Sequence, residues 1–267
     1  MINMGEKFSR ELPVDLSTIL RKLLRGEISL EEAERRLLAL NIRRIRDLAR
    51  LDPGRNCRTG VPEVVFAEGK DPRTVAEAAA ALAKENGYAL VTRLSPPQLA
   101  ELKKRLGRRF ELEINTLARA AVIKRRGHVF PQQGKVGILA AGTADVPVAE
   151  EAALAARVMG CQVLKAYDVG VAGIHRLFEP LQRMVEEGVS ALVVVAGMEG
   201  TLPSIVSSLV DVPVIGVPTS IGYGVGLKGI GALVTMLQSC SPKLAVVNID
   251  NGFGAGVFAA SIARRSR

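Results

Sequence analysis

The second half of this chain alternates short apolar runs with helical stretches, and this alternation limits the folds that it can adopt. The predicted strands are Val136–Ala140, Gln162–Ala166, Ala191–Ala196, Val214–Val217 and Leu244–Ile249. The predicted helices cover residues 147–159, 174–187, 201–209, 229–238 and 254–264. Because continuous apolar strands separated by helices are typical of a parallel sheet covered on both faces, the pattern predicts a doubly wound α/β domain.

The first half of the chain predicts helices followed by a smaller α/β module. Residues 15–50 have the periodicity of two amphipathic helices, and Ser29–Glu32 has the sequence of a capping box. Asp71-Pro72 and Ser95-Pro96 each predict the start of a further helix. Strand-like runs lie at residues 89–92, 110–114 and 120–123 and at the end of segment 58–66.

The positive charge of the chain is concentrated in its first half. Residues 1–133 carry 26 Lys and Arg against 17 Asp and Glu, whereas residues 134–267 carry ten of each. This asymmetry predicts two domains, 1–133 and 134–267. Nucleic-acid binding is not expected, because the Arg residues are interspersed with Glu and stacking aromatic side chains are few. A basic rim that attracts a small anion is an alternative.

Several classes of protein do not fit this sequence. No window of about 18 residues is continuously apolar and the first residues lack the apolar core of a signal peptide, so we expect a cytoplasmic protein. Cys57, Cys161 and Cys240 form neither a disulfide framework nor a metal knuckle, and the first two are expected to be small buried hydrophobes. With two histidines and no HExxH motif, a dedicated transition-metal site is not expected.

Sheets of this kind bind ligands in the loops that follow the carboxyl ends of their strands, beside helix N-termini. Here these loops are Ala141–Asp145, Asp168–His175, Gly197–Gly200, Pro218–Lys228 and Asp250–Gly254. The first loop consists of small residues that let backbone amides approach an anion, so Gly142, Thr143 and Asp145 are candidate phosphate-binding residues. Asp145 could equally serve as the N-cap of the following helix.

Two of these loops carry side chains that could take part in catalysis. Glu199 lies between Gly197 and Gly200, where a carboxylate has little packing to do, and it is either functional or simply solvated. His175 begins a predicted helix and is either a structural residue or a catalytic one.

Two later segments also leave alternatives open. The glycine-rich segment 222–231, which contains Gly224 and Lys228, is either a hinge or an anion-binding loop. Cys240 follows Ser239 in a turn, where it is either a buried hydrophobe or an exposed and reactive thiol.

Residues 135–265 resemble the PurE family of aminoimidazole ribonucleotide carboxylases. The matching segments are 141–153, 173–176, 196–218 and 245–262. Asp145 of the family's phosphate loop is retained, whereas Gly142 and Ala144 stand where that loop has serines, and Thr201 replaces a histidine. The resemblance implies a flavodoxin-like, PurE-like doubly wound sheet.

The whole chain is similar to the LarB family of nickel-pincer cofactor biosynthesis proteins, which join an N-terminal domain to a PurE-like domain. The motifs that carry this resemblance are Pro62–Val65, Thr92-Arg93, Gln238–Cys240 and Val247–Gly254, together with Gly222–Gly226.

The resemblance to LarB implies an enzyme that carboxylates the pyridinium ring of nicotinic acid adenine dinucleotide at C5 with CO2 or bicarbonate and hydrolyses its phosphoanhydride. The products would be pyridinium-3,5-biscarboxylate mononucleotide and AMP, as a step in making the cofactor for lactate racemase maturation. It implies that Cys240 forms a covalent adduct with the ring and that Glu199 removes a proton. The implied substrate-binding residues are Gly142, Thr143, Asp145, Arg176, Gly197, Gly200, Gly224 and Lys228, with His175 assisting catalysis.

A divalent ion such as Mg²⁺ could assist cleavage of the phosphoanhydride, but no metal ligand set and no certain cofactor follow from the sequence. The PurE resemblance implies a homo-oligomer, an octamer by analogy. One alternative function is a PurE-type carboxylase or mutase in purine synthesis, which would not need Cys240. Another is a nucleotide sensor or RNA-binding protein without chemistry.

Overall fold

The computed structural model describes residues 16–39, 43–45 and 49–266, and the chain divides into two compact units after Glu63. The first unit contains α1 (Leu16–Leu24), α2 (Leu30–Ala39), β1 (Arg43–Ile45), β2 (Ala49–Leu51) and α3 (Arg55–Thr59). The two predicted helices are present, and the backbone amide of Glu32 donates to Ser29 Oγ over 3.2 Å. The prediction of helix through residue 50 is wrong, because β1 and β2 form an antiparallel pair too short to show a period of two.

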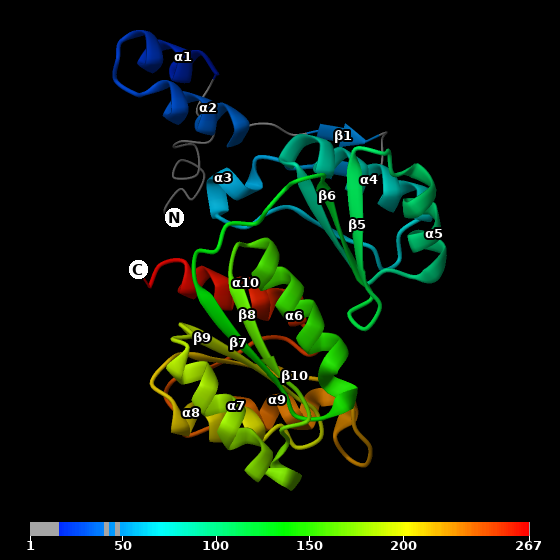
Figure 1. Cartoon of the computed structure of the whole chain (residues 1–267), viewed down its shortest axis with the longest axis vertical. Coiled ribbons are helices and arrows are strands. Elements are labelled where there is room, and N and C mark those ends of the chain that lie inside the picture. The colour runs from blue at the N-terminus through cyan, green and yellow to red at the C-terminus, as the bar shows by residue number, and fades with distance from the viewer. Residues whose placement is uncertain (1–15, 40–42, 46–48, 267) are drawn as a thin grey trace, which may run out of the picture. The chain divides into compact units, whose positions relative to one another are not determined.

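The second unit begins with a four-stranded sheet of order β3-β4-β6-β5 (Figure 1). Its elements are β3 (Val64–Phe66), α4 (Pro72–Asn86), β4 (Tyr88–Thr92), α5 (Pro96–Arg105), β5 (Phe110–Asn115) and β6 (Ala120–Arg125). Asp71 caps α4 by accepting the backbone amide of Thr74 over 2.9 Å, and Gly87 ends this helix in the left-handed conformation with φ 82°. The smaller α/β module is therefore as predicted.

A five-stranded parallel sheet of order β11-β10-β9-β7-β8 follows. Its elements are β7 (Lys135–Ala140), α6 (Val146–Val158), β8 (Gln162–Ala166), α7 (His175–Glu186), β9 (Ala191–Ala196), α8 (Leu202–Leu209), β10 (Val214–Pro218), α9 (Ile230–Leu237), β11 (Leu244–Val246) and α10 (Gly252–Ala263). This order is flavodoxin-like, so the predicted doubly wound sheet is confirmed. β11 ends at Val246 rather than at the predicted Ile249, because its pairing with β10 stops there.

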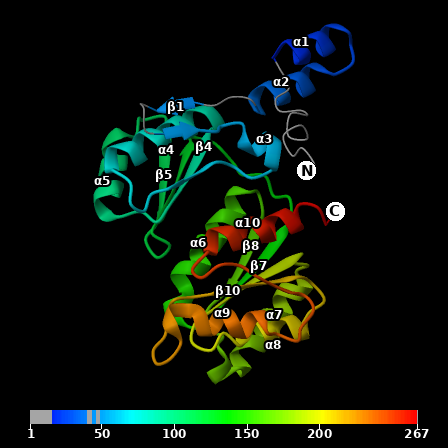
Figure 2. The same cartoon turned by 180° about the vertical axis from the view of Figure 1, so that it is seen from behind.

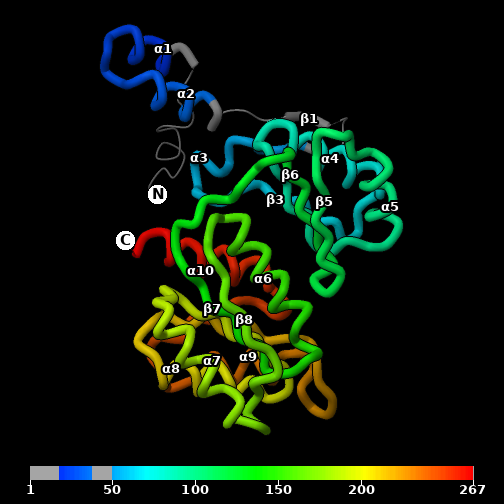
Figure 3. Tube along the Cα trace, viewed as in Figure 1, coloured from blue at the N-terminus to red at the C-terminus, as the bar shows by residue number. Residues whose placement is uncertain are grey.

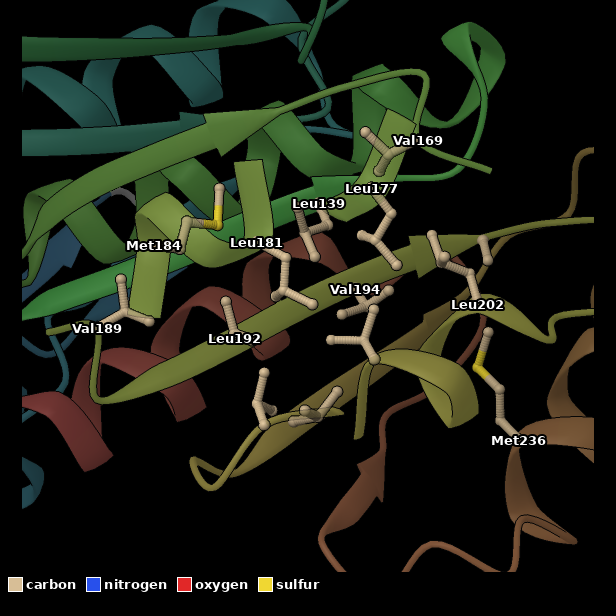
Figure 4. Packing of buried hydrophobic residues seen from close by; sticks show 14 residues of the cluster. Leu139, Val169, Leu177, Leu181, Met184, Val189, Leu192, Val194, Leu202 and Met236 are labelled. Atoms are coloured by element: carbon tan, nitrogen blue, oxygen red, sulfur yellow. The ribbon is translucent and has the colours of Figure 1, made fainter. Parts of the chain in front are cut away.

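Helices cover both faces of the parallel sheet. α6 and α10 pack together on one face, and α7, α8 and α9 lie on the other (Figures 1 and 2). Figure 4 shows the second face, where strand residues Leu139, Leu192 and Val194 meet helix residues Leu177, Leu181, Met184, Leu202 and Met236. Burial of each such side chain stabilises the fold by about 1.5–3 kcal/mol. The loops at the strand ends are therefore anchored at both ends in a well-packed core.

All five strands are parallel, but the side on which successive strands join the sheet changes between β7 and β9. β8 lies on one side of β7, whereas β10 and β11 continue from β9 on the other. The loops that leave β7 and β9 therefore diverge and open a crevice, which is where such sheets bind ligands. The loop between β10 and α9, orange in Figure 3, leaves from the same edge.

The predicted domain boundary near residue 133 falls between β6 and β7, inside the second unit, and the division into domains 1–133 and 134–267 stays a prediction. Within the described ranges, no helix combines the length and the apolar character that crossing a membrane requires.

Candidate active site

A pocket of about 400 Å³ lies at the crevice between the loops that follow β7 and β9. The loops after β8 and β10 also contribute to its lining. The predicted site residues in this lining are Gly142, Thr143, Asp145, Arg176, Gly197 and Glu199. Residues far apart in the sequence thus meet at one edge of the sheet.

Asp145 is the buried polar centre of the pocket. Its Oδ1 accepts a hydrogen bond from Thr219 Oγ1 over 2.7 Å, and its Oδ2 accepts the backbone amide of Gly142 over 2.9 Å. Burial raises the pKa of this carboxyl above its usual range, although the hydrogen bonds from Thr219, Gly142 and Gly197 oppose the shift. Asp145 stands at the predicted N-cap position of α6, but its side chain bonds back to the Gly142 amide at the start of the preceding turn and not to an amide of α6. The carboxylate instead ties the strand-end loops together.

Gly197 and Gly200 occupy positions where the backbone of another segment leaves no room for a side chain. A Cβ at Gly197 would lie 2.4 Å from the carbonyl oxygen of Ile221 and 2.6 Å from Thr219 Oγ1. A Cβ at Gly200 would lie 2.7 Å from the carbonyl oxygen of Ala232, which places this glycine against α9 and not in the pocket lining. Both glycines therefore shape the loop that carries Glu199.

Strained backbone gathers at this edge of the sheet. Of the seven non-glycine residues with positive φ in the described part of the chain, five follow strands of the parallel sheet, namely Asp168, Met198, Leu227, Lys228 and Asp250. Such conformations cost of order 1–3 kcal/mol each and cluster at functional sites. Glu199, next to Met198, is exposed at the pocket wall.

Arg176 and His175 are adjacent at the start of α7, but only Arg176 belongs to the pocket. The Arg176 guanidinium forms an ion pair with Asp168, and both side chains line the pocket while remaining partly exposed. His175 is exposed and is not part of the lining.

A second, smaller pocket of about 210 Å³ lies within the loop between β10 and α9. Gly224 and Lys228 belong to its lining, and Met198 and Ile221 line both pockets. The two pockets are thus neighbours at the same edge of the sheet. The glycine-rich loop and the Lys228 cation in the lining of the second pocket suit an anionic ligand.

Cys240 lies at the opposite edge of the parallel sheet from these two pockets. It is exposed in the turn between α9 and β11, so it precedes a strand, whereas Glu199 follows one. Ser241 Oγ lies 2.6 Å from Ser207 Oγ, which is in the last turn of α8 and therefore at the same far edge. A five-residue strand spans roughly 17 Å, so the thiol of one chain does not reach its own Glu199.

The other two cysteines differ from each other. Cys161 is buried, as predicted. Cys57 is exposed, so the expectation of burial is wrong, because the short helix α3 buries none of its residues.

Within the described residues, no group of three or more His, Cys, Asp or Glu side chains could hold a metal ion. The carboxylates considered from the sequence, Asp145, Asp168 and Asp250, do not form such a group. Thr219, which is fully buried and donates to Asp145, is a supporting residue of the site that the sequence interpretation did not single out. Its position directly after a buried strand was the available indication.

Comparison with known proteins divides the chain between the four-stranded sheet and the five-stranded parallel sheet. Residues 43–126 match a family model described as the LarB/PurE-like N-terminal domain, and residues 135–267 match the model of AIR carboxylase.

Individual relatives cover either the whole chain or its second half. The uncharacterized protein MJ0165 of Methanocaldococcus jannaschii is 48% identical over 94% of this chain and 97% of its own length. N5-carboxyaminoimidazole ribonucleotide mutases of Thermotoga maritima and Pyrococcus horikoshii are each 32% identical over 48% of this chain, covering 74% and 71% of their own lengths. With both domains matched in this order, the chain belongs to the LarB family, in which a LarB/PurE-like N-terminal domain precedes a carboxylase-type domain.

Proposed function

We propose that this protein carboxylates C5 of the pyridinium ring of nicotinic acid adenine dinucleotide and hydrolyses the phosphoanhydride. The products are pyridinium-3,5-biscarboxylate mononucleotide and AMP, for nickel-pincer cofactor synthesis. The observation that carries the proposal is the combination of a LarB-type N-terminal domain with a switch-point pocket that presents Glu199 among glycine-rich loops.

The reaction needs a nucleophile because a pyridinium ring is electron-poor and its C5 does not attack CO2. The Cys240 thiolate adds to C4, the ring π electrons move onto the nitrogen, and C5 becomes the nucleophilic carbon of an enamine. C5 then attacks CO2, forming a carbon–carbon bond and leaving an iminium at N1. Cys240 is exposed, so its sulfur is accessible to the ring of a bound substrate.

Rearomatisation needs a base and a leaving group. Glu199 takes the proton from C5, and the released electron pair restores the dihydropyridine. The nitrogen lone pair then expels the Cys240 thiolate from C4, which regenerates the pyridinium. The net change is replacement of the C5 hydrogen by a carboxylate, with one proton released and no redox change.

The phosphates of the dinucleotide suit the glycine-rich loops beside the Glu199 carboxylate. Thr143 offers a hydroxyl donor in the first pocket, where the amides of Gly142 and Gly197 already donate to Asp145, and Gly224 and Lys228 line the second pocket. Arg176 adds a cation at the pocket wall, where it stabilises charge during attack of water on the anhydride. His175 lies next to it at the start of α7 and would act at the pocket's rim.

The proposal requires a homo-oligomer, because Cys240 and Glu199 of one chain lie at opposite sheet edges. A second copy would bring its Cys240 to the pocket of the first. Exposed apolar side chains support such a contact, since Tyr223 and Val225 are 84% and 96% exposed and Leu237 on α9 is 65% exposed. By analogy with PurE, we propose an octamer.

The ribonucleotide mutases among the relatives favour one alternative, a carboxylase or mutase acting on an aminoimidazole ribonucleotide. That reaction needs no thiol. Thr201 and Ala144 depart from the PurE pattern in this chain, and both line the pocket.

The test is incubation of the protein with nicotinic acid adenine dinucleotide and ¹³C-bicarbonate, followed by mass spectrometry of small molecules. We expect a labelled mononucleotide and an equal amount of AMP. Glu199→Gln should lower kcat by about 10²-fold or more, because the general base is lost. Cys240→Ser should remove carboxylation, since a hydroxyl is a much poorer nucleophile than a thiolate.

Cys57→Ser is the matched control, because Cys57 is also an exposed thiol, and this variant should keep wild-type activity. Full carboxylation by Cys240→Ser would contradict the mechanism. Turnover of an aminoimidazole ribonucleotide that survives Cys240→Ser would instead favour the mutase.

A further inference from the structure

Arg93 joins the smaller sheet to the site edge of the parallel sheet. It follows β4, and its Nε lies 3.3 Å from Oε1 of Glu151, a residue of α6 that is only 4% exposed. Its Nη2 also donates to the backbone carbonyl of Asp250, which lies between β11 and α10. One guanidinium thus bridges two elements of the carboxylase-type domain.

The contact at Asp250 continues into the loop of the second pocket. Asp250 Oδ1 accepts the backbone amide of Ser220 over 2.9 Å, and the Asp250 amide donates to the carbonyl of Pro218 over 2.8 Å. Ser220 belongs to that pocket's lining and follows Thr219, which donates to Asp145. Hydrogen bonds, together with the peptide link between Ser220 and Thr219, therefore connect Arg93 to Asp145 in the main pocket.

The backbone on both sides of this bridge is held in a costly conformation. Arg93 and Asp250 both have φ of 56°, in the left-handed region that disfavours side chains. The Leu94 amide donates to the carbonyl of Arg119 over 2.6 Å, and the Thr92 carbonyl accepts the amide of Ala67 over 2.9 Å. The backbone hydrogen bonds of Thr92 and Leu94 thus hold Arg93 in its strained conformation. In this conformation the guanidinium reaches Glu151 and the carbonyl of Asp250.

Charge explains why the bridge uses a cation. Burial is the main cause that raises the pKa of both Asp145 and Glu151. The negative charge of the Asp250 carboxylate raises both pKa values further by a smaller amount. The Arg93 guanidinium opposes this at Glu151. The positive charge of Arg93 therefore offsets the repulsion between the carboxylates of Glu151 and Asp250, which lie close together at this edge of the sheet.

We propose that Arg93 is a positioning residue through which the N-terminal domain orders the loop 219–229 for substrate binding. Arg93 touches neither pocket, so it acts through Asp250 and Ser220. Its effect on turnover rests on the proposed function, whereas its effect on the loop does not.

Hydrogen–deuterium exchange of the full-length protein without substrate tests the loop directly. Arg93→Met keeps the length of the side chain but loses its charge and donors, and exchange in peptides covering 219–229 and 250–254 should rise by roughly tenfold. Arg93→Lys keeps a cation beside Glu151 but cannot bridge both partners, so an intermediate rise is expected. This second variant provides the test should Arg93→Met fail to fold.

Arg157→Met is the matched control. Arg157 on α6 pairs with Glu113 of β5 over 2.6 Å, so it is another link between the smaller sheet and α6, but it lies in the last turn of α6, at the end away from the site. Exchange at 219–229 should stay at the wild-type rate. Equal loosening by both variants, or no loosening by Arg93→Met and Arg93→Lys, would overturn the proposal.

Kinetics separate positioning from a merely structural role. For Arg93→Met we expect the KM for the dinucleotide to rise about tenfold while kcat stays within about threefold, because the loop binds substrate and holds no reacting group. A wild-type protein without turnover would refute the proposed function and leave the exchange result standing. Turnover with unchanged KM in Arg93→Met would refute the role of Arg93 in binding.

Discussion

Asp145 and Glu150 are buried carboxylates whose pKa values move in opposite directions. Burial raises the pKa of Asp145, and its hydrogen bonds only partly offset the effect. Burial also acts on Glu150, but hydrogen bonds from Lys165, Tyr167 and Asn115 outweigh it and lower the pKa. The difference lies in the partners, since Glu150 accepts from a cation over 2.7 Å, whereas the donors to Asp145 are neutral.

These two groups should change the pH dependence of stability in opposite ways. The lowered pKa of Glu150 adds stability above the unfolded value of 4.5 that is lost as the pH falls through its folded pKa. The raised pKa of Asp145 adds stability below 3.8 that is lost as the pH rises through its folded pKa. Urea unfolding between about pH 3 and 6 should therefore show a shallower rise of stability with pH in Glu150→Gln and a steeper one in Asp145→Asn. The same slope in both variants would contradict this assignment.

At the scale of elements, the contact between α6 and α10 depends on glycine. A Cβ at Gly252 would lie 2.2 Å from the carbonyl oxygen of Val148, and one at Gly256 would lie 2.2 Å from that of Ala152. The two glycines are four residues apart on α10 and let the helix backbones approach closely. Because Asp145 is the N-cap residue of α6, this contact also helps to fix the position of a residue that lines the main pocket.

Gly256→Ala should therefore destabilise the protein by about 1–3 kcal/mol, since the blocking atoms are backbone and the helices must separate. Thermal unfolding measures the effect. Gly107→Ala is the control, because a Cβ there meets nothing within 4 Å, and its melting temperature should equal that of the wild type. An unchanged melting temperature for Gly256→Ala would show that the helices separate without cost.

At the scale of the whole molecule, the distance between Cys240 and Glu199 makes a single chain incomplete for the proposed chemistry. Cys240 precedes a strand and Glu199 follows one, so they stand at opposite edges of one sheet. A closed oligomer solves this problem because each copy supplies the residue that its neighbour lacks.

Mixing two inactive variants tests this arrangement. Subunits with Cys240→Ser and subunits with Glu199→Gln, denatured and refolded together in equal amounts, should regain about a quarter of wild-type activity. That fraction of sites pairs an intact Glu199 with an intact Cys240 from the neighbour. Each variant refolded alone is the control. No recovery in a mixture that forms hetero-oligomers would place both residues in one chain's site.

Much of this architecture follows from local patterns. The strands and helices of residues 135–263 were predictable because apolar runs and helix starts depend on neighbouring residues. Gly142, Asp145 and Gly197 were predictable as site residues because parallel strands carry their ligand-binding loops at one edge. β1 and β2 were not, since three residues show no periodicity.

Local sequence was thus sufficient for a parallel α/β domain, its smaller companion and the loops that carry the candidate residues. Only tertiary packing decided which loops meet, because strand order depends on contacts across the sheet that leave no local pattern. It joined Asp145 to Thr219, 74 residues away, and Arg93 to Asp250, 157 residues away. It also separated Cys240 from Glu199, because a helix returning along a parallel sheet ends at the edge opposite to the one where it began.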